Sequence, residues 1–276
     1  VRDAVAAGLD SGTLPVRRHR PTGGSRPADH VGRVFLVGGG PGAPGLITVR
    51  GRTLLAAADV VVVDRLGPRA LLDTLGPEVE VVDVGKTPRH HPIPQERINE
   101  ILVEHALAGK DVVRLKGGDP FVLGRGGEEA IHCAAHGVPV EVVPGVTSAI
   151  SVPAAAGIPL THRGITASFV VASAHDGAAA ALEAMRDAPV SSTLVLLMGI
   201  TTLRHSADQL IRSGRSPQTP VAFVESGWMP QQRTTVTTLE KAADIAEQED
   251  VRAPAIIVIG DVVKVRNQLG DLRGVS

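Results

Sequence analysis

The sequence is short of residues on which several protein classes depend. It contains one cysteine, one tryptophan, four phenylalanines and no tyrosine among 276 residues. A single cysteine excludes a disulfide framework and any zinc site built from several cysteines, and it fits a reducing compartment. So few aromatic rings provide no stacking platform for single-stranded nucleic acid. The net charge of −1 also removes the electrostatic attraction that nucleic-acid binding requires.

Long charge-free stretches are scarce too, and one of them resembles a membrane span only in length. Residues 142–161 carry no charged side chain over 20 positions, which is long enough to cross a bilayer. Prolines, glycines and hydroxyl side chains interrupt the stretch, so a spanning helix is not expected. The charged start of the chain lacks the apolar core of a signal peptide. We therefore predict a cytoplasmic protein that does not interact with a membrane.

The rest of the composition is that of a globular protein. Hydrophobic residues make up 43% of the chain, and 31 glycines accompany them. The length predicts about two domains, each able to bury its own core. Residues 1–30 differ, because most of this stretch is basic and rich in proline, glycine and serine, as linkers are. Since the chain begins with Val1 instead of methionine, we interpret this stretch as a linker or remnant of an upstream segment, with a cloning remnant as the alternative.

From Arg33 onward, short valine-rich runs alternate with helical patterns. The expected strands of the first half are 34–37, 60–63, 79–84, 112–115 and 140–143. The expected helices are 48–58, 68–75, 94–108 and a segment that ends at 136. Continuous apolar strands separated by helices are typical of a parallel sheet that is covered on both faces. We place this first α/β domain at residues 31–146.

The second half repeats the pattern. The expected strands are 169–172, 193–198, 221–225, 234–238 and 255–259, and the expected helices are 178–186, 201–213 and 239–248. This predicts a second α/β domain over residues 147–276, with the domain boundary in the proline-rich stretch 144–159. The predicted fold class is therefore α/β, with two domains and a ligand cleft between them, which is a common location for a binding site.

A glycine cluster follows the first expected strand. Residues 40–45, GPGAPG, formally match the G-x-G-x-x-G motif of dinucleotide-binding folds. Asp64 ends the next strand, roughly where such folds place the acid that holds a ribose. The two prolines in the loop stiffen it, however, and the segment that follows delays the helix that the third glycine should enter. A dinucleotide site is therefore the weaker of the available interpretations.

A second glycine cluster, over residues 113–129, is more specific. Gly117 and Gly118 allow a ligand to approach the backbone because no Cβ atom is present. Asp119 offers a carboxylate at the end of a parallel strand, where open α/β sheets bind ligands. The plain alternative is a turn with Gly-Gly-Asp-Pro chemistry. Such a turn does not require the further Arg-Gly-Gly that begins at Arg125.

Five segments, in this order, resemble the tetrapyrrole methylase family: VGGGPGAPGLITVRG, VVDRLG, VRLKGGDPFVLGRGGEE, VPGVTSA and GIPLTHRG. The similarity extends from about Gly32 to Val263, and within the family it is greatest to the uroporphyrinogen-III C-methyltransferases. The resemblance implies two α/β domains with S-adenosylmethionine in the cleft between them. It also implies S-adenosylhomocysteine as the product of that methyl donor, and usually a homodimer.

The motifs that carry the resemblance also imply site residues. The implied cofactor-binding residues are Pro41, Gly117, Gly118, Asp119, Val122, Thr147, Ser148, Met198 and Gly227. Asp64 matches the family's proton acceptor, and Lys86 matches its proton donor. The chain departs from the family pattern at Ala43, where Asp is frequent, at Val122, where Ile is usual, and at Ser148, where Ala is usual. These differences concern affinity and fine selectivity more than the reaction.

The chemistry of the implied reaction is compatible with these residues. Two methyl transfers would convert uroporphyrinogen III to precorrin-2, for sirohaem or cobalamin synthesis. Transfer from a sulfonium is an in-line displacement, so catalysis depends largely on orientation. Asp64 is expected to accept the proton that the methylated ring loses, while Lys86 either donates a proton or holds a carboxylate. The side chains expected to bind the substrate's carboxylates are Arg65, Arg125, His162 and Arg163, each with a plain solvated-loop alternative.

Other histidines, and two competing functions, complete the set of hypotheses. His132 and His136 have the helical spacing of a metal pair, but the sequence positions no third ligand, so a helix face without metal is expected. His90 and His91 lie in a proline-bounded loop, either as a substrate contact or as plain loop residues. The competing functions are methylation of another tetrapyrrole and a non-catalytic nucleotide-binding module.

Overall fold

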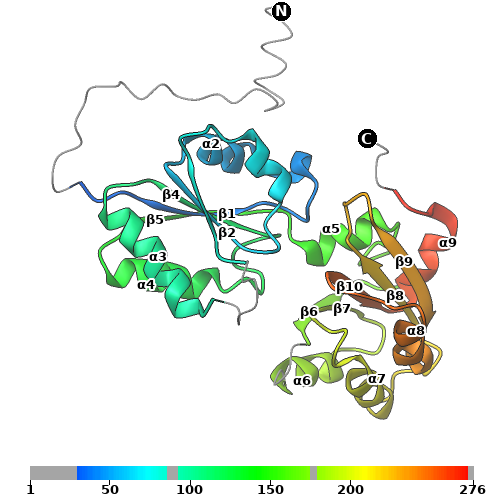
Figure 1. Cartoon of the computed structure of the whole chain (residues 1–276). Coiled ribbons are helices and arrows are strands. Elements are labelled where there is room, and N and C mark those ends of the chain that lie inside the picture. The colour runs from blue at the N-terminus through cyan, green and yellow to red at the C-terminus, as the bar shows by residue number, and fades with distance from the viewer. Residues whose placement is uncertain (1–29, 86–92, 175–178, 273–276) are drawn as a thin grey trace, which may run out of the picture. The chain divides into compact units, whose positions relative to one another are not determined.

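The computed structural model describes residues 30–85, 93–174 and 179–272 (Figure 1). The chain divides into two compact units, of which the first ends at Thr147 and the second begins at Ser148. Each unit has its own β-sheet and its own hydrophobic core. Within the described ranges, no helix combines the length and the apolar character needed to cross a membrane.

The described part of the first unit contains a five-stranded sheet in the order β3-β2-β4-β1-β5. Its strands are β1 (Val34–Gly38), β2 (Val60–Val63), β3 (Glu80–Asp83), β4 (Val112–Lys116) and β5 (Val140–Val143). Every pairing in this sheet is parallel, as the valine-rich runs predicted. The carboxyl ends of all five strands therefore lie at one edge of the sheet, which we call the carboxyl edge.

Helices cover both faces of this sheet (Figure 1). The helical elements are η1 (Pro44–Leu46), α2 (Val49–Ala57), η2 (Arg69–Thr74), α3 (Gln95–Leu107) and α4 (Gly126–Ala135). One core lies between the sheet and α2 with η2, and the other lies between the sheet and α3 with α4. Because side chains alternate along a strand, β4 directs Leu115 to the α2 side, while Arg114 and Lys116 point to the α4 side.

The second unit's sheet is mixed, so the expectation that the parallel pattern repeats is wrong. Its order is β6-β7-β10-β8-β9. The strands are β6 (Phe169–Ser173), β7 (Thr193–Leu197), β8 (Pro220–Glu225), β9 (Arg233–Thr238) and β10 (Ala255–Ile259). Only β6 and β7 pair in parallel, and the other three pairings are antiparallel. The connection 226–232 between β8 and β9 is too short for the crossover that parallel strands need.

Helices again cover both faces. They are α5 (Ser148–Ala155), α6 (Ala179–Asp187), α7 (Leu203–Arg212), η3 (Leu239–Lys241), α8 (Ala242–Gln248), η4 (Asp261–Val265) and α9 (Arg266–Leu269). Helices α7 and α8 pack on one face, and α5 packs with η4 on the other. Helix α5 was not predicted, because its stretch of the sequence contains so many helix breakers. Pro153 lies inside this short helix, where it cannot donate the backbone hydrogen bond to the carbonyl four residues earlier.

Candidate functional site

Two glycine-containing loops are hydrogen-bonded to each other at the carboxyl edge of the first unit. The backbone amide of Gly40, which follows β1, donates to the carbonyl of Gly118 with an N···O distance of 3.2 Å. The amide of Gly118, which follows β4, donates to the carbonyl of Gly40 at 2.7 Å. Both residues have positive φ angles, of 78° and 65°, which glycine adopts without steric cost. The two glycine clusters of the sequence therefore form one continuous backbone surface, with half-buried Pro41 directly after Gly40.

Asp119 connects this surface to the loop that follows β5. Its Oδ1 atom accepts from the amide of Phe121 at 2.8 Å, which closes a local turn, and its Oδ2 atom accepts from the amide of Gly145 at 3.0 Å. A Cβ atom at Gly145 would lie only 2.2 Å from the carbonyl oxygen of Gly118. Asp119 thus joins its own loop to the loop after β5, a structural role that the motif alone did not reveal.

Gly117 has a structural reason to be glycine that the sequence motif did not show. A Cβ atom at this position would lie 2.5 Å from the carbonyl oxygen of Leu66, in the loop that follows β2. The close approach is therefore made by a neighbouring loop. The structure therefore gives Gly117 a structural reason to be glycine, beside the predicted approach of a ligand, and it implies that substitution of Gly117 disturbs the fold of the edge itself.

Asp64 lies directly after β2, with 28% of its side chain exposed. Its Oδ1 atom accepts from the backbone amides of Leu66 and Gly67 at 3.0 and 2.9 Å. Its Oδ2 atom accepts from Nη2 of Arg114 at 2.9 Å. Since a carboxylate offers about four lone-pair positions, these three bonds fix the orientation of Asp64 and leave capacity for one more.

The local geometry does not support the dinucleotide hypothesis. Gly45 lies in the short η1, and α2 begins only at Val49, after an N-cap at Thr48 whose hydroxyl accepts from the amide of Gly51 at 3.0 Å. A dinucleotide fold instead requires the glycine loop to run directly into a helix whose N-terminus faces the phosphates. The glycine loop therefore matches the G-x-G-x-x-G motif in sequence but does not run directly into a helix, as a dinucleotide-binding loop does.

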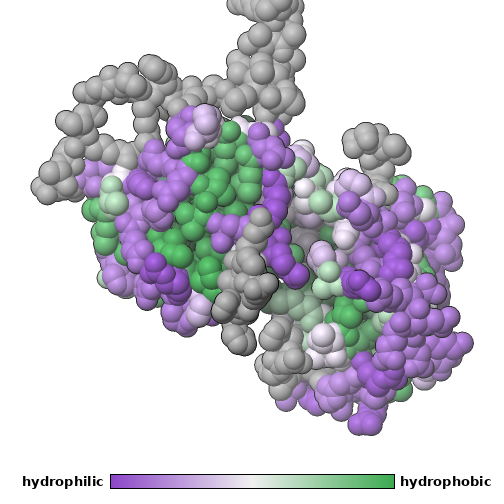
Figure 2. All heavy atoms as spheres, viewed as in Figure 1, coloured by the Kyte–Doolittle hydropathy of each residue, from purple (hydrophilic) through white to green (hydrophobic). Residues whose placement is uncertain are grey.

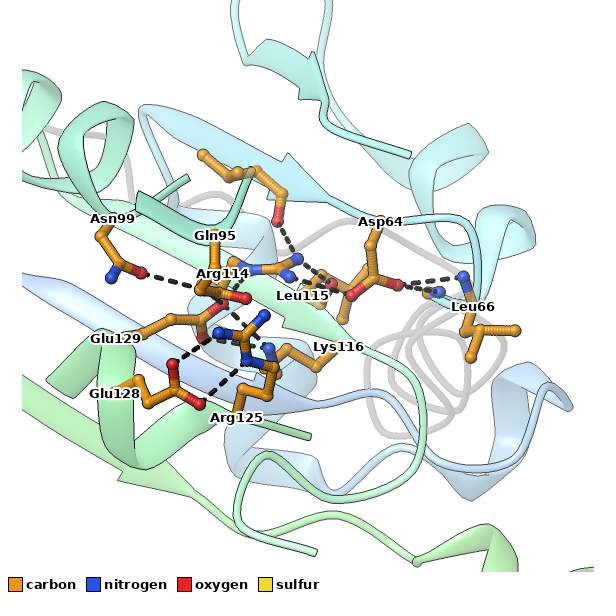
Figure 3. A network of polar contacts seen from close by, with 12 residues as sticks. Asp64, Leu66, Gln95, Asn99, Arg114, Leu115, Lys116, Arg125, Glu128 and Glu129 are labelled. Atoms are coloured by element: carbon orange, nitrogen blue, oxygen red, sulfur yellow. Dashed lines mark hydrogen bonds and ion pairs between the residues drawn. The ribbon is translucent and has the colours of Figure 1, made fainter. Parts of the chain in front are cut away.

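Behind Asp64 lies a buried network of charged side chains (Figure 3). The side chains of Arg114, Lys116 and Glu129 are 3%, 4% and 0% exposed. Glu129 accepts from Nε of Arg114 at 3.0 Å, and both of its oxygens accept from Nζ of Lys116, at 2.9 and 3.0 Å. Burial lowers the pKa of Lys116, the charge of Arg114 lowers it further, and Glu129 opposes both. This network was not predicted from the sequence, although Arg114 and Lys116 occupy alternate positions of an otherwise apolar strand, which was its signal.

Lys86, the predicted proton donor, lies outside the described residues, as do His90 and His91. The residue before it, Gly85, is described. A Cβ atom at Gly85 would lie 2.2 Å from the backbone nitrogen of Arg65, next to Asp64. The chain therefore enters the segment of Lys86 in direct contact with the loop that carries Asp64.

The arginines of this edge differ in their partners. The side chain of Arg125 forms two hydrogen bonds to Glu128, at 2.9 and 2.7 Å, and precedes α4 with a positive φ of 59°. This hydrogen bonding raises the pKa of Arg125 and lowers that of Glu128. Arg65 is exposed, and so is the predicted cofactor contact Val122. The carboxyl edge thus brings together Asp64, Arg65, the 117–122 loop and Arg125.

The second unit gathers a further group of predicted residues. Met198 follows β7 and Gly227 lies two residues after β8. Because both strands are antiparallel to β10, they run in the same direction and end at the same edge. Met198 has a φ of 56°, an uncommon conformation that often marks functional positions. A Cβ atom at Gly227 would lie 2.5 Å from Val152 of α5, the helix that Ser148 begins directly after Thr147.

His162 and Arg163 lie elsewhere in the second unit. They belong to an exposed turn in which the amides of Ile165 and Thr166 donate to the carbonyl of His162, both at 3.0 Å. This turn leads into the beginning of β6. Since β6 runs parallel to β7, its beginning is at the opposite edge of the sheet from Met198. The structure of this unit therefore does not bring the predicted substrate residues of the turn together with Met198 and Gly227.

The two histidines of α4 form a local pair. The ring centroids of His132 and His136 are 4.5 Å apart, and Nδ1 of His136 lies 2.8 Å from the carbonyl oxygen of His132. Among the residues that the structure describes, no group of three metal-binding side chains occurs. The two rings are neighbours because side chains four residues apart lie on the same face of a helix.

Fold and edge together define an α/β protein with glycine-rich loops at the carboxyl ends of a parallel sheet, the usual ligand-binding edge of such folds. The profile of the Tetrapyrrole (Corrin/Porphyrin) Methylases matches residues 33–243. The chain therefore belongs to the tetrapyrrole methylase family, as the sequence motifs predicted.

Individual relatives support this assignment. The chain is 46% identical to the S-adenosyl-L-methionine-dependent uroporphyrinogen III methyltransferase of Methanosarcina barkeri, over 88% of this chain and 96% of that protein. It is also 46% identical to the siroheme synthase of Pseudomonas paraeruginosa, over 88% of this chain but 52% of that protein. The solved uroporphyrin-III C-methyl transferase from Thermus thermophilus, complexed with S-adenyl homocysteine, is 43% identical with a TM-score of 0.72, covering 85% of this chain and 94% of that one.

Proposed function

We propose that this chain is an S-adenosylmethionine-dependent C-methyltransferase that converts uroporphyrinogen III to precorrin-2 by two methyl transfers. The observation that carries the proposal is the 46% identity to a named uroporphyrinogen III methyltransferase along nearly the whole of that relative. The product would serve sirohaem or cobalamin synthesis, and the similarity to siroheme synthases fits the first of these routes.

The carboxyl edge offers surfaces that suit the methyl donor. Three large apolar side chains are exposed in the loops after β2 and β4, namely Leu66, Phe121 and Leu123, at 56%, 57% and 44%. The face of the first unit that is seen in Figure 2 also carries a broad apolar area framed by hydrophilic residues. Apolar walls with a few polar groups are typical of sites for small ligands. When bound, S-adenosylmethionine supplies a methyl group on a sulfonium. The residues assigned to hold it in the first unit are Pro41, Gly117, Gly118, Asp119, Val122 and Thr147, and those assigned in the second unit are Ser148, Met198 and Gly227.

We assign Asp64 as the group that accepts the proton. After the ring carbon receives the methyl group, the ring must lose a proton, and a carboxylate held at a fixed angle can accept it. The bonds to Leu66, Gly67 and Arg114 provide that fixed angle. Lys86 is assigned as the proton donor because of its motif position, and the residue before it, Gly85, lies against the backbone of Arg65.

The substrate is a polycarboxylate, and the arginines supply its expected partners. Guanidinium groups bind carboxylates through two parallel hydrogen bonds. Arg65 and Arg125 are exposed at the carboxyl edge, and Arg163 with His162 is exposed in the second unit's turn. We assign all four to substrate binding. A homodimer in the cytoplasm, with a small-molecule substrate and no nucleic acid, completes the proposal.

The decisive experiment is incubation of the purified chain with uroporphyrinogen III and labelled S-adenosylmethionine, followed by mass analysis of the tetrapyrrole. We expect label in the product and a mass increase of two methyl substitutions. The proposal would be refuted if this chain left uroporphyrinogen III unchanged while a known relative methylated it in a parallel reaction. Methylation of a different tetrapyrrole under the same conditions would instead favour another activity on this fold.

A further inference from the structure

Three charged side chains are buried beneath Asp64, and the proposed reaction has so far given them no role. They are Arg114 and Lys116 of β4 and Glu129 of α4, all at most 4% exposed. Moving charges out of water is costly, and replacement of a buried ion pair by apolar residues is often neutral or stabilising. Stability alone is therefore a weak explanation for placing these groups between a sheet and a helix, directly behind the predicted catalytic carboxylate.

The geometry connects Glu129 to Asp64 through one guanidinium. Nε of Arg114 donates to Glu129 at 3.0 Å, and Nη2 of the same side chain donates to Asp64 at 2.9 Å (Figure 3). The guanidinium group is planar and rigid. Once Glu129 fixes its Nε atom, the direction in which Nη2 points is fixed as well.

Glu129 is itself held firmly. Besides Arg114, it accepts from Lys116 with both oxygens and from Nε2 of Gln95 at 3.2 Å. Gln95 is in turn bonded to Asn99 at 2.9 Å. Two cations and two anions, Asp64 included, balance the charge of the cluster. Because α4 and β4 both contribute side chains, Glu129 ties the orientation of Arg114 to the packed core of the unit.

We propose that Glu129 is a positioning residue for methyl transfer, which aims Arg114 and thereby holds the Asp64 carboxylate at the angle that the reaction requires. Glu129 is too deeply buried to touch substrate, so it acts only through the Arg114–Asp64 pair. The inference rests on the proposed function, since it gives Asp64 a place in that reaction.

The test uses the full chain and single-turnover methylation of uroporphyrinogen III at saturating concentrations of both reactants. In Glu129→Gln, the charge that holds Arg114 is lost, and we expect the rate to fall roughly 10- to 100-fold, the effect of a small misplacement of a reacting group. Calorimetric affinity for S-adenosylhomocysteine should stay unchanged. Because this substitution leaves the buried ammonium of Lys116 without its counter-charge and can impair folding, a second variant combines Lys116→Met with Glu129→Leu, which keeps the cluster neutral.

The double variant also separates positioning from stability. We expect it to melt cooperatively and to methylate slowly, and in an Asp64→Asn background the same pair of changes should cause no further loss of rate. A folded double variant with the wild-type rate would overturn the inference, and so would an additive loss in the Asp64→Asn background. Failure of the wild-type chain to methylate uroporphyrinogen III would instead refute the proposed function, so the two failures are distinguishable.

Discussion

Asp64→Asn distinguishes the two functions that a carboxylate after β2 can have. In a dinucleotide site, loss of the charge would weaken cofactor binding, and activity would fall with it. In the methylase, Asn keeps the shape but cannot accept the proton. We therefore expect single-turnover methylation to fall by ~10²–10⁴-fold, the range for loss of a general base, while affinity for S-adenosylhomocysteine changes little.

The loss of stability that accompanies Asp64→Asn can be estimated from the hydrogen bonds of Asp64. The oxygen of Asn can still accept from Leu66 and Gly67, but its amide group would face Nη2 of Arg114, which is 2.9 Å from the carboxylate. A charge-assisted hydrogen bond contributes about 1.5–3 kcal/mol, and the 28% exposure of Asp64 favours the lower end. For a chain of this size we expect the melting temperature to fall by roughly 3–6 °C.

Asp83→Asn is the matched control. Asp83 ends the neighbouring β3, accepts from the amide of Gly85 at 2.9 Å and pairs with Arg69 at 2.7 Å. It therefore loses a similar set of bonds on substitution, without a proposed role in proton transfer. Differential scanning fluorimetry, calorimetry and rapid-quench methylation on both variants decide the matter. Loss of cofactor affinity in Asp64→Asn, or equal loss of rate in both variants, would show the assignment of Asp64 to be wrong.

Three further substitutions or reagents probe other parts of the first unit. Gly145→Ala should lower the free energy of unfolding by about 1–3 kcal/mol, because the added Cβ atom would collide with backbone. Gly45→Ala is the control and should not lower it, since no atom lies within 4 Å of the added Cβ. Equal melting curves for the two variants would contradict the loop contact. Arg125→Ala should raise the KM for the tetrapyrrole more than that for the methyl donor, since a bidentate carboxylate contact is lost; equal effects would mean that the pair with Glu128 is only structural. Cys133 is buried, and burial raises the pKa of its thiol to about 11, so alkylating reagents should modify it at mildly alkaline pH only after denaturation; rapid labelling of the native chain would contradict its burial.

Much of the fold could be predicted from local sequence. The strand expected at 140–143 coincides with β5, and α3, expected over 94–108, extends over Gln95–Leu107. These predictions succeed because valine runs and a 3.6-residue apolar period are local signals. The direction of β10 could not be predicted, since an interior strand is apolar whether its neighbours are parallel or antiparallel. That choice depends on which strands the chain places side by side.

The site could be predicted at the level of motifs but not at the level of contacts. The motifs select Asp64, Gly117 and Asp119 as candidates, because these residues stand at strand ends in characteristic segments. The reason for glycine at position 117 is a carbonyl group distant in sequence, and no local pattern records it. Glu129 belongs to a helix that otherwise gives an ordinary amphipathic signal. Only the packing of α4 against β4 shows that its carboxylate faces Arg114 and Lys116.

The mutual bonding of the loops after β1, β4 and β5 has a consequence for how this unit folds. Gly40, Gly118 and Gly145 come from distant parts of the chain, and the bonds that unite them form only when all three strands have found their places. Such non-local contacts are late and slow events in folding. A partly folded unit therefore possesses sheet and helix but lacks the surface to which we assign the methyl donor, so we expect competence to bind to appear together with the last cooperative step. The same coupling means that ligand, by favouring only the completed state, stabilises the whole unit and not one loop of it.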